Sequence, residues 1–275
     1  MKSLCIMLAS LLTVADLSAA DSSGPTPVPL VNNGGLPGYA LAWSDEFDGS
    51  QLDLSIWDYR TDSKANSVQK KENVSVGNGF LHLGVKHEKA GALEFTGAGV
   101  ISKRRFTYGF YEARMKVPPG AGWHTSFWAM LHAEVPTDGS RREVSCQEVD
   151  FIEQDSGRAT MYHVNVHRWK GGHAGGQWQT IESPNLSAGF HVFGGEFTPK
   201  AVKFYLDGKL MATRDVSMVR VKDKHGVEGL QPFEHGPQNI WLTAISYGVT
   251  PDKVDTAKLP SEALIDYVRY FEKHQ

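Results

Sequence analysis

Alternation of apolar and polar residues, with a period of two, is the main pattern along this chain. Residues 80–85 alternate after the turn-forming pair Asn78-Gly79, and a second alternating run covers residues 110–117. Successive side chains of a β-strand point to opposite faces of its sheet, so these runs predict half-buried strands. Residues 240–245 are mostly apolar, which is typical of a strand at the centre of a sheet.

Turn residues separate the predicted strands. Asp207-Gly208 lies between the alternating residues 202–206 and the short run 210–212, which predicts a β-hairpin. Residues 264–271 carry apolar side chains at helical spacing, but their tyrosine and valine content favours a strand. Many short strands and few helices predict an all-β fold, a jelly-roll sandwich of two antiparallel sheets.

The first 35 residues differ from the rest of the chain. Lys2 precedes an apolar run over residues 4–14, and Ser18-Ala19-Ala20 supplies small residues for cleavage, as in a signal peptide covering residues 1–20. Residues 21–35 are rich in Pro, Gly, Ser and Asn and predict a flexible lead-in. We therefore expect a secreted or periplasmic protein with one catalytic domain over residues 36–275.

The net charge limits the classes of binding partner, and the cysteine content limits disulfide formation. The net charge of −3 gives no reason to expect nucleic acid or an acidic membrane as partner and leaves a neutral polysaccharide open. Cys5 lies in the predicted signal peptide, so Cys146 cannot form an intramolecular disulfide in the mature chain. We expect Cys146 to be a small buried strand residue, and the protein to be a monomer.

Three acidic residues fall on one predicted strand, Glu148-Val149-Asp150-Phe151-Ile152-Glu153. Glu148 and Asp150 share a face, and a one-residue bulge after Asp150 would return Glu153 to that face. Two glutamates held this way suit a retaining glycosidase, where one attacks the sugar and the other is acid and then base. Mutual repulsion would raise the pKa of one acid. Calcium binding or a plain solvated face are the alternatives.

The same strand resembles the bulged E-x-D-x-x-E signature of glycoside hydrolase family 16, and the resemblance continues over about residues 40–272. Further matching motifs occur in the expected order: Ser44-Asp45-Glu46-Phe47-Asp48, Tyr108-Gly109-Phe110-Tyr111-Glu112-Ala113-Arg114, Phe127-Trp128, His163-Val164-Asn165-Val166-His167, and Asp266-Tyr267-Val268-Arg269. The resemblance implies a concanavalin-like jelly roll with an open substrate cleft. It also implies endo-hydrolysis with retention, Glu148 as nucleophile, Glu153 as general acid/base and Asp150 tuning the nucleophile.

Substrate choice is less clear, because bulged members of that family commonly cleave β-1,3-glucans or marine galactans. The chain has Ala98-Gly99-Val100-Ile101 where the glucanases carry an arginine, and one extra residue between Trp123 and Phe127-Trp128. We expect β-1,3-glucan first, with agar, porphyran or carrageenan as the alternative. A carbohydrate-binding module without activity and a polysaccharide lyase are the competing classes.

Aromatic and polar residues near the acidic strand are candidates for sugar binding. Trp123, Trp128 and Trp169 could each stack on a sugar ring, with core packing as the alternative. Asn66 resembles a family position that contacts sugar hydroxyls, or it caps a loop. We expect His167 to donate a hydrogen bond near Glu148 or to substrate.

Metal chemistry has little support in the sequence. His163 and His167 share a strand face, but no third zinc ligand is evident. Related bacterial enzymes carry calcium away from the cleft, and Asp266 is the residue of this chain that would bind it. We expect no required cofactor, with a structural calcium ion as the one candidate.

Overall fold

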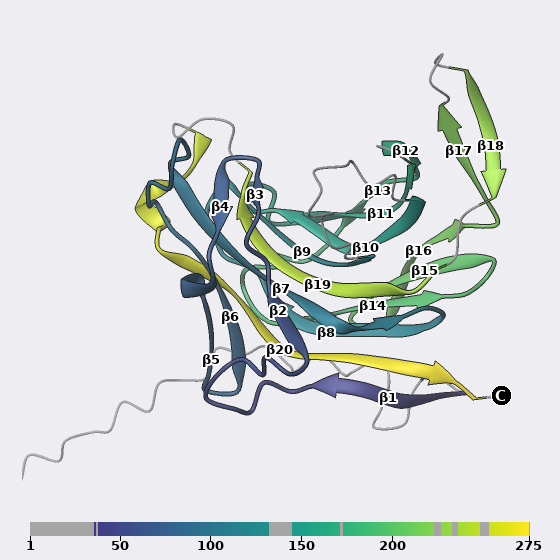
Figure 1. Cartoon of the computed structure of the whole chain (residues 1–275), viewed down its shortest axis with the longest axis horizontal. Helices are drawn as coiled ribbons and strands as arrows, with labels where there is room; N and C mark the ends of the chain where they lie inside the picture. Colours follow the sequence, from purple (N-terminus) through teal and green to yellow (C-terminus); the bar gives the residue numbers. More distant parts are fainter. Residues whose placement is uncertain are drawn as a thin grey trace, which may run out of the picture.

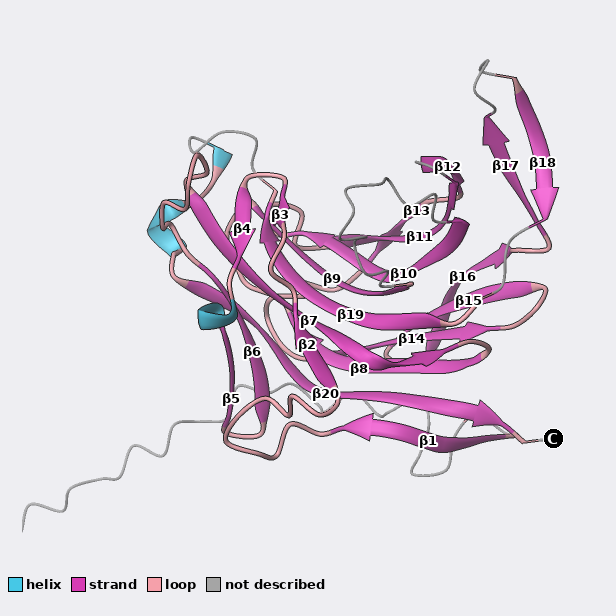
Figure 2. Cartoon of the chain, viewed as in Figure 1, coloured by secondary structure: helices cyan, strands magenta, loops and turns pink. Residues whose placement is uncertain are grey.

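The computed structural model describes residues 36, 38–131, 145–170, 173–222, 227–232, 236–247 and 253–274. The predicted signal peptide and lead-in lie outside these residues, so both stay predictions. Figure 2 shows that most of the described chain is strand, with short 3-10 helices at Lys71–Asn73 and Thr256–Lys258. No helix in the described part is long and apolar enough to cross a membrane.

Two large sheets are layered on each other (Figure 1). The eight-stranded sheet contains β1 (Tyr39–Asp45), β5 (Val74–Gly77), β6 (Phe80–Val85), β8 (Gly109–Lys116), β14 (His191–Phe197), β15 (Ala201–Leu206), β16 (Lys209–Asp215) and β20 (Ser261–Lys273). Its order is β16-β15-β14-β8-β20-β6-β5, with β1 on β20, and every pair is antiparallel.

The ten-stranded sheet contains β2 (Trp57–Tyr59), β3 (Ser63–Lys64), β4 (Ser67–Gln69), β7 (Phe95–Phe106), β9 (Trp123–Met130), β10 (Ser145–Asp155), β11 (Met161–Lys170), β12 (His173–Gly176), β13 (Gln179–Glu182) and β19 (Gln238–Ser246). Its central order is β11-β10-β9-β19-β7, and only β4 pairs in parallel. Figure 1 shows it curving, with its concave side turned away from the other sheet. We call that side the cleft face. A separate hairpin, β17 (Met218–Lys222) and β18 (Glu228–Pro232), projects beyond it.

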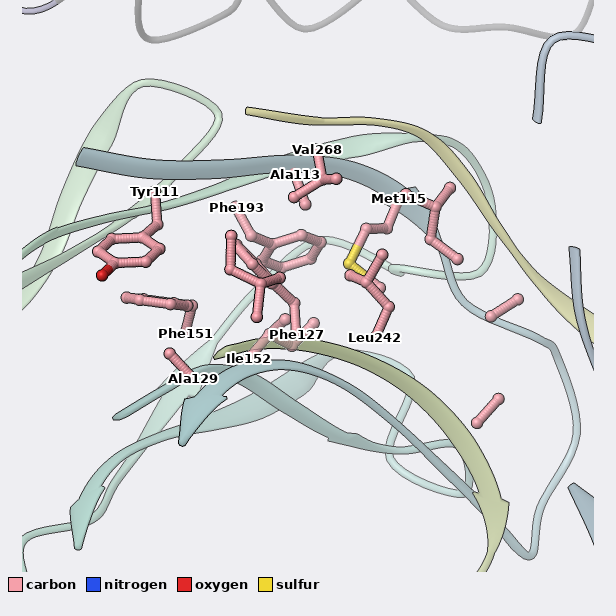
Figure 3. Close-up of a cluster of buried hydrophobic side chains, with 14 of the residues drawn as sticks. Tyr111, Ala113, Met115, Phe127, Ala129, Phe151, Ile152, Phe193, Leu242 and Val268 are labelled. Atoms are coloured by element: carbon pink, nitrogen blue, oxygen red, sulfur yellow. The ribbon is translucent and has the colours of Figure 1, made fainter. Parts of the chain in front are cut away.

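The core lies between the two sheets. Figure 3 shows Tyr111 and Met115 of β8 facing Phe127 of β9, Phe151 of β10 and Leu242 of β19. All five side chains are at most 1% exposed. Burial of each such side chain contributes about 1.5–3 kcal/mol, so the apolar half of each alternating strand holds the two sheets together.

The predicted strands are found as β6, β8, β19, β20 and the hairpin β15–β16. The hairpin turn places Asp207 and Gly208 at φ values of 48° and 83°, the left-handed conformation that this turn type requires. The all-β sandwich of two sheets is confirmed. Cys146 lies in β10, but its side chain is outside the described part of the structure, so its burial stays a prediction.

Candidate active site

Strand β10 carries the acidic residues and is irregular where the sequence predicts a bulge. Asp150 lies opposite Asn165 of β11, and Glu153 lies opposite His163, so three steps along β10 match two along β11. The pairing with β9 shifts in the same place, between Asp150 and Ile152. The predicted one-residue bulge is confirmed.

Two consecutive apolar residues hold the bulge in place. Phe151 is 1% exposed and Ile152 is fully buried, so both side chains enter the core. The Phe151 ring lies against Gly195 of β14, where an added Cβ would be 2.2 Å from ring carbon Cδ1. Because two successive residues point inward, Glu153 returns to the cleft face beside the other acidic residues.

Glu148 and Asp150 form a buried acidic pair. Burial raises the pKa of Glu148 to about 7, the charge of Glu153 adds to this, and a hydrogen bond from the Trp169 indole N–H opposes it. Burial, together with the charges of both glutamates, raises the pKa of Asp150 well above its ordinary range. The hydrogen bond between the two side chains raises the pKa of Asp150 and lowers that of Glu148, so Asp150 holds the proton of the pair more tightly than Glu148 does.

Glu153 has a different environment, because a histidine lies beside it. His124 of β9 places Nε2 at 3.5 Å from Glu153 Oε1 and Nδ1 at 2.8 Å from Asp155 Oδ1. Burial lowers the pKa of His124, but these two carboxylates outweigh burial and raise it to about 9. Burial raises the pKa of Glu153, yet the hydrogen bond and charge of His124 outweigh it and lower the pKa. The raised pKa expected on one acidic residue thus falls on Glu148 and Asp150, not on Glu153.

His167 and Trp169 approach the acidic pair from β11. His167 lies opposite Glu148, and its Nε2 is 3.4 Å from Asp150 Oδ2 and 2.6 Å from Asn165 Nδ2. The indole N–H of Trp169 donates to Glu148 Oε2. Both residues therefore contact the acidic pair. The sequence predicted only sugar stacking for Trp169, and that stays a prediction.

Aromatic side chains line the cleft face next to the acidic pair. Trp128 lies opposite Asp150 in the pairing of β9 with β10 and stacks on Trp241 with ring centroids 4.6 Å apart. The guanidinium carbon of Arg60 is 5.9 Å and 5.7 Å from the centroids of these two rings. Arg60 is 8% exposed and is paired with Asp62 at 2.7 Å. The sequence identified Trp128 but missed the buried arginine.

The expectation that Trp123 stacks on sugar is wrong. Trp123 is 1% exposed, and its indole N–H bonds to the backbone oxygen of Pro118 at 3.4 Å. β9 pairs with β19 in unbroken register, so Trp123 and Trp128, five residues apart, must point to opposite faces. The odd spacing could have shown this from the sequence alone.

Asn66 lies in the turn between β3 and β4, beside the end of β19. Its backbone N–H donates to Ser246 O at 3.2 Å, and its side-chain Nδ2 is buried without a protein hydrogen-bond partner. A buried donor without a partner costs about 1–3 kcal/mol. This donor fits the predicted contact with a sugar hydroxyl, which stays a prediction.

A pocket of about 360 Å³ opens beside Glu153. Its lining residues are His124, Glu153, Asp155, Arg158, His163, Asn165, Trp178 and Tyr247. Trp178 is 65% exposed and Tyr247 is 53% exposed, so two large aromatic faces are open to solvent there. Exposed aromatic rings beside polar groups are typical of sugar-binding surfaces, and the sequence did not predict either of them.

Asp266, the residue expected to bind calcium, lies in an ion pair, and the calcium site stays a prediction. Its Oδ2 is 2.6 Å from Arg114 Nη1, so a guanidinium already balances the carboxylate charge. Among the described residues, Glu148, Asp150 and His167 have ligand atoms within 4.8 Å of one another. Those three are the acidic pair and the histidine beside it, so this cluster coincides with the site already described.

Two glutamates on the cleft face of a jelly roll are the pair of carboxyl groups that a glycoside hydrolase requires. A family model described as "Beta-porphyranase A-D, GH16 domain" matches residues 40–272. The chain belongs to glycoside hydrolase family 16, a family of endo-acting glycanases.

Known relatives agree with this assignment. A β-glucanase of Rhodothermus marinus is 28% identical over 249 residues, which are 86% of this chain and 86% of that protein. β-Porphyranase D of Zobellia galactanivorans is 30% identical over 182 residues, 56% of this chain and 42% of that protein. The X-ray structure of the laminarinase from Rhodothermus marinus superposes with a TM-score of 0.70 at 25% identity, covering 86% and 98% of the two chains.

Proposed function

We propose that this protein is an exported, retaining endo-hydrolase of a β-linked galactan of the porphyran or agar type. In this proposal Glu148 is the nucleophile and Glu153 is the general acid/base. The observation that carries the reaction type is the one-residue bulge, which puts both glutamates on the cleft face of one rigid strand. The predicted signal peptide supports export.

The surroundings of Glu148 suit nucleophilic attack on the anomeric carbon. The Trp169 N–H and the protonated Asp150 both donate to Glu148, so its charge is stabilised although the side chain is buried. When Glu148 becomes an ester in the glycosyl-enzyme intermediate, that charge is lost and Asp150 can ionise more easily. Asp150 would thereby hold the charge of the pair near one unit through the cycle.

The choice of galactan rests on the family model and on Arg60. The model that matches residues 40–272 is that of β-porphyranases, and a named β-porphyranase is 30% identical over 182 residues. The guanidinium of Arg60 lies near the stacked rings of Trp128 and Trp241, which we call the aromatic floor. The Arg60 side chain packs against Gly99, where an added Cβ would be 3.0 Å from Arg60 Cβ. A guanidinium is the side chain best suited to a sulfate ester on a sugar.

β-1,3-Glucan is the second candidate. The β-glucanase of Rhodothermus marinus matches 86% of this chain, and the laminarinase structure of the same organism covers the same share. Arg60 also weakens the case for a sulfated substrate, because Asp62 already takes its Nε and Nη2 donors at 2.7 Å and 3.0 Å. A neutral sugar would then stack on Trp128 without needing the arginine.

One screen separates the candidates. The mature protein is incubated with porphyran, agarose, κ-carrageenan, laminarin and lichenan, and the products are sized, with Glu148→Gln as control. We expect oligosaccharides of several lengths from porphyran or agarose and none from the control. Release from laminarin alone would replace galactan with β-1,3-glucan. Binding without release would indicate a carbohydrate-binding module, and ultraviolet absorbance from unsaturated ends would indicate a lyase.

A further inference from the structure

A histidine and a fourth acidic residue lie behind Glu153, outside the three-acid motif. His124 reaches Asp155 Oδ1 with Nδ1 at 2.8 Å and Glu153 Oε1 with Nε2 at 3.5 Å. The His124 side chain is 12% exposed, and that of Asp155 is 34% exposed. One imidazole thus connects the acid/base of the proposed function to a second carboxylate.

The arrangement of Glu153, His124 and Asp155 depends on strand pairing. β9 and β10 pair so that His124 lies opposite Asp155, and the bulge puts Glu153 on the same face. Tyr247, just after β19, stacks on the imidazole with ring centroids 5.0 Å apart and an interplanar angle of 28°. The ring is held between one aromatic face and two carboxylates.

Among the residues that the structure describes, charged or titratable groups from three strands and a turn surround His124. Glu153 and Asp155 come from β10, and Tyr247 follows β19. His163 of β11 and Arg158 of the turn after β10 lie in the same pocket and act on Asp155. The two carboxylates are the nearest of these, so they favour the doubly protonated imidazolium over the neutral ring.

A retaining acid/base must carry a proton in the first step and be ionised in the second. An imidazolium beside Glu153 favours its ionised form, which suits the second step but leaves the first step without a proton on Glu153. The imidazolium itself holds a proton 3.5 Å away, on Nε2. His124 can therefore supply the proton that its own positive charge disfavours on Glu153.

We propose that His124, oriented by Asp155, is a positioning residue that stores the proton which Glu153 delivers to the leaving group. This proposal rests on the role of Glu153 in the proposed function. The hydrogen bond to Asp155 keeps Nδ1 protonated, so Nε2 is the nitrogen that exchanges a proton with Glu153.

The proton balance closes over one turnover. In the first step the Nε2 proton moves to Glu153 Oε1 and on to the glycosidic oxygen, while the C–O bond breaks and Glu148 bonds to the anomeric carbon. In the second step Glu153 takes a proton from water, the water oxygen displaces Glu148, and the proton returns to His124. No further reactant is required.

The first test needs no substrate. Histidines labelled with ¹⁵N are followed by NMR against pH in the wild type and in Asp155→Asn, and His124→Asn assigns the signal. We expect His124 to be doubly protonated at pH 7 and to titrate near pH 9, with the midpoint at least one pH unit lower in Asp155→Asn. A His124 that is neutral at pH 7 in the wild type overturns the proposal.

The second test compares leaving groups in His124→Asn. Porphyran requires a proton on its leaving oxygen, whereas the 2,4-dinitrophenyl β-glycoside of a porphyran disaccharide does not. We expect kcat/KM to fall about 100-fold on porphyran, the lower end of general acid catalysis, and less than about threefold on the dinitrophenyl glycoside. Equal losses on both substrates, or no loss on porphyran, overturn the proposal.

The control is a matched histidine on the other sheet. His191 Nδ1 is 2.7 Å from Asp207 Oδ2, with the His191 side chain 13% exposed, and β14 is outside the cleft face. His191→Asn should keep wild-type kinetics on both substrates. If wild-type protein cleaves laminarin instead of porphyran, laminarin and a laminaribioside replace the two probes. If it cleaves neither, the proposed function fails, and the NMR titration alone decides the state of His124.

Discussion

Two acidic residues of the eight-stranded sheet and two of the ten-stranded sheet have opposite surroundings. On the eight-stranded sheet, Glu196 of β14 is 2.7 Å from Lys203 Nζ, and Asp266 of β20 is 2.6 Å from Arg114 Nη1. On the ten-stranded sheet, Glu148 and Asp150 face each other, with Glu153 close enough to raise the pKa of both. The first arrangement balances each carboxylate with a cation, and the second places carboxyl groups beside one another so that they resist ionisation together.

The two arrangements have different consequences: one stabilises the folded state, and the other favours reactivity. Burial raises the pKa of Glu196, but Lys203 and Tyr39 outweigh it and lower the pKa, so this charge supports the folded state. Burial raises the pKa of Glu148 to about 7, so ionising this residue opposes folding. Groups that destabilise a fold in this way are typical of active sites, where they are kept for reactivity.

Removing one carboxylate from each sheet should give the largest contrast. Glu148→Gln deletes the proposed nucleophile and should lower kcat by more than about 10⁴-fold. Glu196→Gln changes a distant ion pair and should leave kcat within about twofold of the wild type. Reducing-sugar release from porphyran measures both. Comparable activity in Glu148→Gln would show that Glu148 is not the nucleophile.

Trp169→Phe tests the hydrogen bond that keeps Glu148 ionised. This bond lowers the pKa of Glu148 against the effect of burial, so its loss should raise that pKa. The acid limb of kcat/KM should move to higher pH, and kcat should fall about 10-fold, a loss typical of one hydrogen bond to a charged group. Trp43 is a partly buried indole that packs against Trp57, and Trp43→Phe should leave the profile in place. An unchanged acid limb in Trp169→Phe would refute this role.

Gly195→Ala tests how the bulge is held. The new Cβ would lie 2.2 Å from Phe151 Cδ1, so the ring and the bulge must shift, and we expect a loss of about 1–3 kcal/mol in unfolding free energy. Activity at a temperature where the variant is folded should also fall. Gly189→Ala, where an added Cβ meets nothing within 4 Å, should change stability by less than about 0.5 kcal/mol. Denaturant unfolding measures both, and equal stabilities would contradict this account of the bulge.

The pH dependence of stability should differ in sign between the sheets. The folded pKa of Glu148 is raised from 4.5 to about 7, so its contribution is present below pH 4.5 and lost as pH rises through 7. Glu148→Gln should therefore be more stable than wild type at pH 8, by about 1–3 kcal/mol, and similar at pH 4.

The pKa of Glu196 is lowered, so its contribution is present above the ordinary value and is lost as pH falls. Glu196→Gln should be less stable than wild type at pH 8, by about 0.5–1 kcal/mol for a partly exposed pair. Thermal unfolding at both pH values compares the two variants. Shifts of the same sign would remove the contrast between the sheets.

The fold and the bulge could be predicted from the sequence because both depend on local periodicity. Alternation identifies β6, β8 and β19, and the extra residue in the spacing of Glu148, Asp150 and Glu153 requires a bulge if all three are to share a face. The same parity rule, applied to Trp123 and Trp128, would have corrected the expectation for Trp123.

The remainder of the site depends on which strands become neighbours. His124 meets Asp155 through the register of β9 with β10, and Trp169 meets Glu148 across β11. Arg60 reaches the aromatic floor from the segment after β2, far from Trp128 and Trp241 along the chain. A single sequence shows the residue types but not the pairing, so these contacts could not be predicted.

The stereochemistry of hydrolysis tests the central claim, that one bulge places Glu148 and Glu153 for a retaining reaction. Wild-type protein is mixed with porphyran, or with the polysaccharide that the screen identifies, and ¹H NMR follows the new reducing ends before mutarotation. We expect the β anomer to form first and the α anomer to appear later. Initial formation of the α anomer would contradict this claim, because inversion needs the two carboxylates about 6.5–9.5 Å apart with a water between them.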